Sequence, residues 1–246
     1  MRFTLLKLSY FFLIWYTIGL LLMLFYEVPH FLQFTNGLFL VFYALSLTEI
    51  IFLVSDNRLG MIKRIAFVGL ITFIIEVCGV RTGFPFGSYH YNATLGPRYW
   101  GVPITIAMAW VGVIVNSLLL STQHSKWRRA LETGMWVVVL DLILDPVAVE
   151  RMFWVWDEKG SFYGIPVINF ISWAIIAALL SLFFPLFQTN KRVLSWSHRL
   201  FEAMIAMFGL LAWKARLEPL SLLALVFLLM IEGRFQFDSR KKKQVV

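Results

Sequence analysis

Long apolar runs alternate with short polar segments along the chain, and eight such runs can be counted. The first six are each long enough to cross about 30 Å of hydrocarbon as a helix. They occupy residues 8–26, 31–54, 62–80, 103–120, 132–149 and 165–186. Two shorter runs at 197–213 and 217–232 predict a helical hairpin that either spans the membrane or only dips into it. Because the backbone in lipid must satisfy its own hydrogen bonds, the pattern predicts an all-α, polytopic helical membrane protein with about eight transmembrane helices.

Composition agrees with this interpretation. Hydrophobic residues make up 60% of the chain and charged residues only 15%, against about 25% charged residues in soluble domains. The first run is too long for the core of a signal peptide, and no small-residue cleavage site follows it. No linker rich in Pro, Gly or Ser divides the chain, so residues 1–246 are predicted to form a single transmembrane domain. We expect this domain in the inner membrane of a prokaryotic cell.

The positive charges predict the orientation. If the N-terminus is inside, the inner segments hold 16 Lys and Arg residues and the outer segments hold 6. Positive residues flank helices on the cytoplasmic side, so both ends are predicted to lie in the cytoplasm. The same flanks account for the net charge of +8, and no basic patch lies outside them, so we predict no nucleic-acid partner. The basic tail Arg240–Lys243 is expected to face solvent or lipid headgroups.

Two stretches of the chain resemble each other. In each, an aromatic residue, Gly, a β-branched residue and Pro are followed by Trp seven residues after the Pro, over Trp100–Trp110 and Tyr163–Trp173. Aromatic segments precede both, at Phe84–Tyr91 and Phe153–Trp156. Both follow a run with acidic residues toward its outer end, so we interpret spans 3–4 and 5–6 as a parallel internal repeat. The two Pro residues are expected in the first turns of spans 4 and 6, where a missing N–H costs nothing.

Four acidic residues lie inside the predicted spans, where a charged side chain is costly and indicates function by default. Glu49 lies toward the inner end of span 2, and Glu76 lies toward the outer end of span 3. Asp141 and Asp145 lie in span 5, and their spacing of four places both carboxyls on one helix face. Asp145, Asp141 and Glu76 are the catalytic candidates, the alternative being a structural polar cluster bonded to neighbouring helices. For Glu49, near the opposite surface, the structural interpretation is favoured.

Aromatic and polar residues are concentrated near the outer acids. Tyr and Trp at a membrane interface ordinarily form an aromatic belt, but their density beside these carboxyls is unusual. His90 alone is more typical of a structural hydrogen bond than of a proton carrier. Asn116 in span 4 and Asn169 in span 6 are expected to hydrogen bond between helices. The candidate substrate-binding residues are Arg81, Tyr89, His90, Tyr91, Trp110, Trp154, Trp156 and Asn169.

Buried carboxyls beside aromatic rings in a lipid-facing bundle fit one type of chemistry. A buried carboxyl can hold a proton near neutral pH and donate it to a lipid-soluble substrate. Aromatic faces can stabilise the resulting carbocation without trapping it covalently. The combination favours protonation of an isoprenoid double bond, followed by capture with water or by cyclisation. A cation such as Arg81 or protonated His90 beside the acid would strengthen it.

These residues also resemble the membrane carotenoid hydratases. The first half of the similarity comprises Glu76-x-x-Gly79, the segment Gly83–Tyr91, Leu95-Gly96, Gly101-Val-Pro103 and Trp110. The second half comprises Asp141-x-x-x-Asp145-Pro146, Trp154-x-Trp156 and Tyr163–Trp173 with Asn169. The similarity covers roughly residues 70–175, which we treat as a motif-bearing repeat core. Spans 1, 2, 7 and 8 are expected to surround this core.

The resemblance implies addition of water across a terminal carbon–carbon double bond of an acyclic carotenoid or similar polyisoprenoid, giving a tertiary alcohol. It implies a lyase acting in the hydration direction, with no redox cofactor and no metal. The resemblance does not identify the catalytic acid. Our own hypothesis is that Asp145 or Asp141 donates the proton and that Glu76 positions or deprotonates the water. The cation site at the outer membrane face would be lined by Tyr89, Tyr91, Trp154 and Trp156.

The expected partners are a lipid-soluble carotenoid, water, the lipid bilayer and other enzymes of the carotenoid pathway. Three alternatives stay open. A carotenoid cyclase would use the same protonation but exclude water. A membrane prenyltransferase would need Mg²⁺ held by paired Asp-rich motifs, and the chain has one Asp-x-x-x-Asp. A non-catalytic protein that binds or transports a lipid would leave every pigment unchanged.

Overall fold

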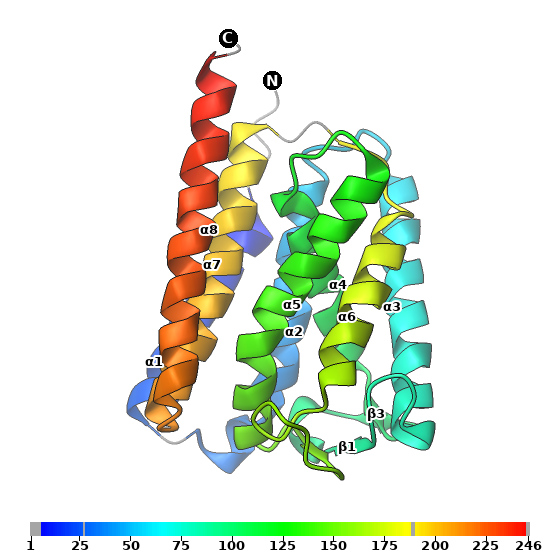
Figure 1. The fold of residues 1–246 in the computed structure, drawn as a ribbon, viewed down its shortest axis with the longest axis vertical. Helices are drawn as coiled ribbons and strands as arrows, with labels where there is room; N and C mark the ends of the chain where they lie inside the picture. The colour runs from blue at the N-terminus through cyan, green and yellow to red at the C-terminus, as the bar shows by residue number, and fades with distance from the viewer. Residues whose placement is uncertain (1–5, 27, 188–189, 245–246) are drawn as a thin grey trace.

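The structure is a computed structural model that describes residues 6–26, 28–187 and 190–244. Within these residues eight α-helices stand side by side as a bundle (Figure 1). They are α1 (Lys7–Phe25), α2 (Phe34–Ile51), α3 (Arg58–Thr82), α4 (Thr105–Leu120), α5 (Lys126–Glu150), α6 (Val167–Ser181), α7 (Lys191–Lys214) and α8 (Glu218–Gln244). Each helix coincides with one of the predicted apolar runs, so the helical fold class is confirmed. The N-terminal segment 1–5 and the side chains of the basic tail at 240–243 lie outside the described part of the chain.

Four of the described helices are long and apolar enough to cross a membrane, namely α1, α2, α3 and the part of α8 at Glu218–Ser239. α4 and α6 are apolar but shorter, with 16 and 15 residues. α5 and α7, with 25 and 24 residues, both begin with positively charged residues. The chain is therefore a membrane protein, and the crossing of the bilayer by all eight helices stays a prediction.

α7 and α8 are longer than the two short runs predicted for them, with 24 and 27 residues. Most of the additional residues, at 191–196 and 233–244, lie at the end of the bundle where α8 ends, and many of them are polar. In the added part of α8, Arg234 bonds the carboxylate of Asp238 over 2.8 Å. Arg234 of α8 bonds Glu132 of α5 over 2.8 Å. The prediction counted apolar residues alone, and it missed polar turns whose side chains pair with one another.

Glu49 and Asn116 have structural partners. The Glu49 carboxylate accepts hydrogen bonds from the backbone N–H groups of Leu8 and Ser9, over 3.3 and 2.9 Å. These N–H groups belong to the first turn of α1 and have no acceptor within that helix, so Glu49 acts as its cap. The Asn116 side chain bonds the Tyr43 hydroxyl over 2.8 Å and so joins α4 to α2, as predicted.

Two small antiparallel sheets cover the end of the bundle opposite the end of α8 (Figure 1). β1 (Tyr89–Tyr91) pairs with β4 (Trp154–Trp156), and β2 (Arg98–Tyr99) pairs with β3 (Val102–Pro103). The β1–β4 pair joins the segment that follows α3 to the segment that follows α5. The aromatic segments that precede the two similar stretches therefore lie side by side.

The two stretches also share a backbone conformation. Trp100 and Tyr163 both have a φ of 52°, and the glycines that follow, Gly101 and Gly164, have φ values of 89° and 83°. Positive φ suits glycine but strains an aromatic residue. An aromatic residue and a glycine that both adopt positive φ are therefore an uncommon local structure, and both stretches contain it. The agreement favours the internal repeat, which stays a prediction. Both prolines lie just before α4 and α6 rather than in their first turns. Pro103 ends strand β3, and Pro166 is the N-cap of α6 with an extended backbone at ψ 134°.

Candidate active site

Glu76 is held by three hydrogen-bond donors. It lies toward the C-terminal end of α3, and the residue is only 2% exposed. Its Oε2 accepts a hydrogen bond from the Tyr91 hydroxyl over 2.8 Å, and the Tyr89 hydroxyl donates to the same oxygen. Its Oε1 accepts a hydrogen bond from Trp110 Nε1 over 2.8 Å. Three donors on one buried carboxyl stabilise its ionised form.

Asp141 and Asp145 of α5 are linked through Asn169 of α6. The Asn169 amide nitrogen donates to Asp145 Oδ2 over 2.7 Å and lies 3.3 Å from Asp141 Oδ2. The second oxygen of Asp145 accepts a hydrogen bond from Trp154 Nε1 over 2.7 Å. Both aspartates are 2% exposed, and the described residues form no ion pair with either of them or with Glu76. The described part of the chain also contains no group of three His, Cys, Asp or Glu residues arranged to hold a metal ion.

The alternation of β1 aims the two tyrosines inward. Tyr89 and Tyr91 are buried, whereas His90 between them is exposed, because successive side chains of a strand point to opposite faces. In the register of the sheet Tyr89 lies opposite Trp156, and Tyr91 lies opposite Trp154. Burial, together with the negative charge of Glu76, raises the pKa of both tyrosine hydroxyls above the ordinary value. Both tyrosines therefore remain neutral hydrogen-bond donors.

Two tryptophans, one from each of the similar stretches, stack on each other next to Glu76. The ring centroids of Trp110 and Trp173 are 3.7 Å apart, and the ring planes differ by 12°. Each lies seven residues after the proline of its own stretch. The stack supports Trp110, which donates to Glu76, and brings α4 and α6 together at the level of the acids.

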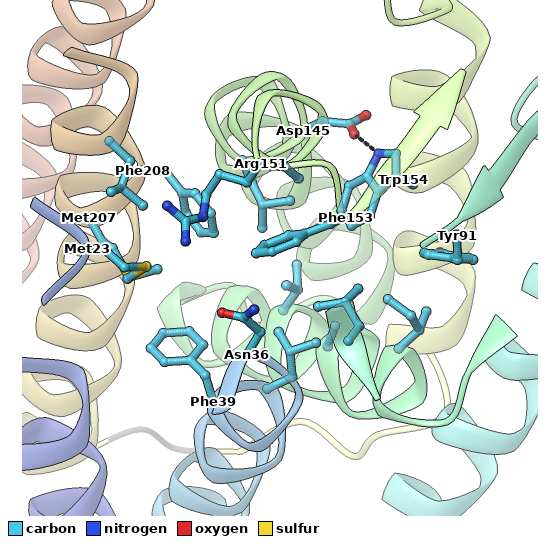
Figure 2. Close-up of a pocket in the computed structure, with 18 of the residues that line it drawn as sticks. Met23, Asn36, Phe39, Tyr91, Asp145, Arg151, Phe153, Trp154, Met207 and Phe208 are labelled. Atoms are coloured by element: carbon cyan, nitrogen blue, oxygen red, sulfur yellow. Dashed lines mark hydrogen bonds between the residues drawn. The ribbon is translucent and has the colours of Figure 1, made fainter. Parts of the chain in front are cut away.

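These groups surround an apolar cavity of about 330 Å³. Its polar lining residues include Glu76, Asp145 and Asn169, together with Thr35, Asn36 and Arg151, and Asp141 is not among its lining residues. Figure 2 draws the side chains around it, with the Trp154–Asp145 hydrogen bond at one side and Met23 and Phe208 at the other. Asp145 is therefore the aspartate that a molecule in the cavity would meet.

The cavity corrects one expectation. Spans 1, 2, 7 and 8 were expected only to surround the core at residues 70–175, but α1, α2 and α7 supply much of the cavity wall. The lining residues from these helices include Trp15, Ile18, Gly19, Phe39, Met207 and Phe208. The expectation was wrong because apolar lining residues have the same composition as residues that face lipid, and only the three-dimensional arrangement distinguishes them.

The structure brings most of the predicted site residues together, but not all. Tyr89, Tyr91, Trp154, Trp156 and Asn169 line the cavity, and Trp110 contacts Glu76 directly; their candidate roles stay predictions. Arg81 is exposed at the end of α3, and His90 is exposed with Nδ1 3.0 Å from Asp157 Oδ1. Neither lines the cavity, and among the described residues neither forms an ion pair with Glu76, Asp141 or Asp145.

Other cavity residues were not anticipated. They are Asn36, Phe86, Arg151, Phe153 and Trp173. The position of Trp173 could have been inferred from its place in the repeat, since Trp110 was already a candidate. Arg151 was visible as a positive residue just after the end of span 5, but no pattern in the sequence indicated that it lines the cavity. Asn36 belongs to none of the sequence motifs described above, so no pattern indicated its place at the cavity.

Comparison with known proteins gives two matches. The model of a family described as carotenoid biosynthesis protein matches residues 35–231, which extends well beyond the predicted core at 70–175. A protein of Haloarcula japonica named bisanhydrobacterioruberin hydratase is 34% identical over 163 residues, or 63% of this chain and 53% of that protein. The chain thus matches about half the length of this curated relative. No solved structure matches the chain.

Proposed function

Because the chain belongs to the carotenoid biosynthesis protein family, we propose that it is a hydratase of acyclic carotenoids or similar polyisoprenoids. The reaction adds water across a terminal carbon–carbon double bond and gives a tertiary alcohol. The relative from Haloarcula japonica carries the name of a hydratase, which supports this reaction class. We propose that the reaction needs no redox cofactor.

One observation carries the proposal. Asp145 and Glu76 meet in an apolar cavity, and their hydrogen-bond partners in the described chain are neutral side chains. Burying three carboxylates without a cation is costly, so the cluster is expected to retain at least one proton near neutral pH. We assign that proton to the Asp141–Asn169–Asp145 group, because Glu76 already has three donors that stabilise its anion. The cavity therefore combines a proton donor, a fixed negative charge and aromatic walls.

The first step is protonation of the alkene. Asp145 transfers its proton to the less substituted carbon of the terminal double bond, and the π electrons form the new C–H bond. The other carbon becomes a tertiary carbocation. The donors on Asp145, Trp154 Nε1 and Asn169 Nδ2, stabilise the carboxylate that remains. Glu76 and the rings of Tyr89 and Trp156 stabilise the cation.

The second step is capture by water. A water oxygen bonds to the tertiary carbon, and the resulting oxonium group loses one proton to a carboxylate. If Asp145 accepts this proton, the enzyme returns to its starting state and the net change is the addition of one water. A cavity of about 330 Å³ fits the end of a polyisoprenoid, so we expect the rest of the molecule to extend between the helices toward lipid.

The membrane arrangement is part of the proposal. We propose that all eight helices cross the inner membrane of a prokaryotic cell, with both ends in the cytoplasm and the carboxyls near the outer face. The positive charges of the inner segments support this orientation. We also propose that α3–α4 and α5–α6 arose by duplication, which the matching φ values and the Trp110–Trp173 stack support. Other enzymes of the carotenoid pathway are candidate partners.

The test is expression of the full chain in a host that accumulates lycopene, followed by mass analysis of the pigments. The wild type is expected to produce a pigment heavier by one water. Asp145→Asn is expected to abolish this product, and Asp141→Asn and Glu76→Gln to reduce it strongly. Asp157→Asn is the matched control, because Asp157 is an exposed carboxyl outside the cavity. Immunoblots of the membranes check that every variant accumulates.

The alternatives give different results. A cyclase would convert the pigment without a gain in mass, and a lipid-binding or transport protein would leave every pigment unchanged. Full activity in Asp145→Asn, Asp141→Asn and Glu76→Gln together would refute the proposed roles of the carboxyls.

A further inference from the structure

A second, polar pocket adjoins the apolar cavity. Its volume is about 210 Å³, enough for several water molecules. Its polar lining comes from the end of α1, the start of α2, the segment before β2, the end of α5 and the end of α7. The polar residues are Tyr26, Gln33, Asn36, Thr94, Arg151 and Lys214.

The two cavities meet at a shared wall. Met23, Val28, Asn36, Arg151 and Phe153 line both of them. Figure 2 shows the Arg151 side chain pointing into the space between Phe153, Asn36 and Met23. The wall therefore has polar groups from two different helix ends, set among apolar side chains.

The guanidinium of Arg151 has no hydrogen-bond acceptor among the described residues, and its Nε is buried. Its one aromatic contact is with Phe153, whose ring centroid lies 5.7 Å from the guanidinium carbon. The other cation of the pocket, Lys214, already donates to the carbonyl oxygens of Met23 and Tyr26 at the end of α1. A partly buried guanidinium needs polar partners, and a hydrocarbon substrate supplies none.

The acid end of the cavity offers few free polar sites. Both oxygens of Asp145 and both oxygens of Glu76 accept hydrogen bonds from protein side chains. The hydrating water must nevertheless reach the cation, because without it the cation returns to an alkene by losing a proton. The polar pocket is the neighbouring space whose side chains favour water.

We propose that the polar pocket is a water-binding vestibule, and that Arg151 and Asn36 pass water from it to the carbocation in the apolar cavity. This inference rests on the proposed hydratase function and adds two positioning residues to it. The positive charge of Arg151 also disfavours the carbocation at this end, so the reacting carbon is held at the carboxyl end. Water thus enters from one side and the proton from the other.

Deuterium separates the two steps. In D₂O the acid delivers a deuteron, and the carbon that receives it then carries one hydrogen and one deuterium. Capture by water gives a deuterated alcohol. Loss of the hydrogen instead returns a deuterated alkene without any gain of water. The ratio of deuterated alkene to alcohol therefore measures how well water reaches the cation, independently of how fast the acid reacts.

The experiment uses membranes that contain the full chain, incubated with lycopene in D₂O buffer. Arg151→Met and Asn36→Leu are expected to raise the ratio of deuterated alkene to alcohol about tenfold, the effect of losing a hydrogen bond between water and a charged or amide group. Arg151→Lys, which keeps a cation, is expected to restore the ratio to within about threefold of the wild type. Lys159→Met, which removes an exposed charge from an outer loop, is the matched control and should leave the ratio unchanged.

The outcomes are distinct. A parallel fall of deuterated alkene and alcohol in Arg151→Met, with an unchanged ratio, would overturn the vestibule while leaving the hydratase function intact. It would mean that Arg151 supports only folding or substrate binding. A wild type that forms neither product would overturn the proposed function, and the vestibule with it.

Discussion

The side-chain amide of Asn169 donates a hydrogen bond of 2.7 Å to Oδ2 of Asp145 on the neighbouring helix. Because the same nitrogen lies 3.3 Å from Asp141 Oδ2, one amide group bridges two buried carboxyls. The amide can donate two hydrogens, so it can serve both carboxyls whichever of them holds a proton. This link makes the two aspartates one titrating group, of which only Asp145 faces the cavity.

We therefore predict that Asn169→Leu lowers product formation roughly 10- to 100-fold, because a buried carboxylate loses one of its donors. Asn92→Ala is the control, since the Asn92 amide donates to the Met152 carbonyl outside the cavity. The measurement is the yield of hydrated pigment per amount of protein in the membrane. An unchanged yield in Asn169→Leu would contradict the bridging role.

We predict that the stability of the protein depends on pH through the two tyrosines of β1, Tyr89 and Tyr91. Burial, followed by the charge of Glu76, raises the pKa of Tyr89 and Tyr91 above the ordinary value of 10.0. A group whose pKa is raised by folding contributes its full stability below the unfolded pKa and loses it as the pH rises further. The two hydroxyls should therefore stabilise the protein fully up to about pH 10 and progressively less above it.

The measurement is thermal unfolding of the purified protein in detergent between neutral and strongly alkaline pH. Tyr89→Phe and Tyr91→Phe are each expected to cost about 1–3 kcal/mol at neutral pH, because Glu76 loses a buried donor. Each should also weaken the decline of stability at high pH. A decline that begins near pH 8 and persists in both variants would show that other groups cause it.

The open space beside Gly19 leads to a prediction about where the substrate chain lies. It lines the cavity, and a side chain added there would meet no atom within 4 Å. Gly19→Leu should fill this space and lower hydration roughly tenfold, the effect expected when a few carbon atoms no longer fit. Gly233→Leu is a matched control, because Gly233 also faces open space but lies on α8, away from the cavity.

Both changes replace a helical glycine with a better helix former, which favours folding by about 1 kcal/mol. Loss of activity in Gly19→Leu alone would therefore report occupancy of the cavity rather than damage to the helix. Equal activity in the two variants would place the substrate elsewhere.

We predict that removing the Glu49 carboxylate lowers the stability of the protein without changing the product of the reaction. Glu49→Ala leaves two N–H groups of the first turn of α1 without their acceptor, which should cost about 1–3 kcal/mol. The residue lies at the opposite end of the bundle from the carboxyls, so the product made by the remaining folded protein should be unchanged. Glu218→Ala, which removes an exposed glutamate from the first turn of α8, should have a much smaller effect on stability. A changed product in Glu49→Ala would contradict the capping role.

The helices and the acids were predictable, because each is a local property of the sequence. Apolar runs predicted all eight helices, and the cost of burying charge identified Glu76, Asp141 and Asp145. Strand β1 turns Tyr89 and Tyr91 inward and His90 outward. A strand of only three residues is too short to be recognised from its sequence pattern. Arg81 was expected near the acids because it is close in sequence, but it lies at an exposed helix end.

The cavity walls were beyond sequence-based prediction. A residue such as Phe208 or Ile18 has the same hydrophobicity whether it faces lipid or an internal space. Its position follows from packing between helices that are distant in the sequence. Arg151 shows the converse case, because a positive residue after a membrane helix is ordinarily solvated.

The pairing of β1 with β4 has a consequence for biogenesis. Tyr89 and Tyr91, which hold Glu76, lie on one strand, and Trp154, which holds Asp145, lies on the other. During synthesis Glu76 enters the membrane well before β4 has emerged from the ribosome. Neither carboxyl can therefore gain its final surroundings until α5 has been inserted and β1 has paired with β4. Assembly of the candidate active site is a late event that depends on both halves of the chain.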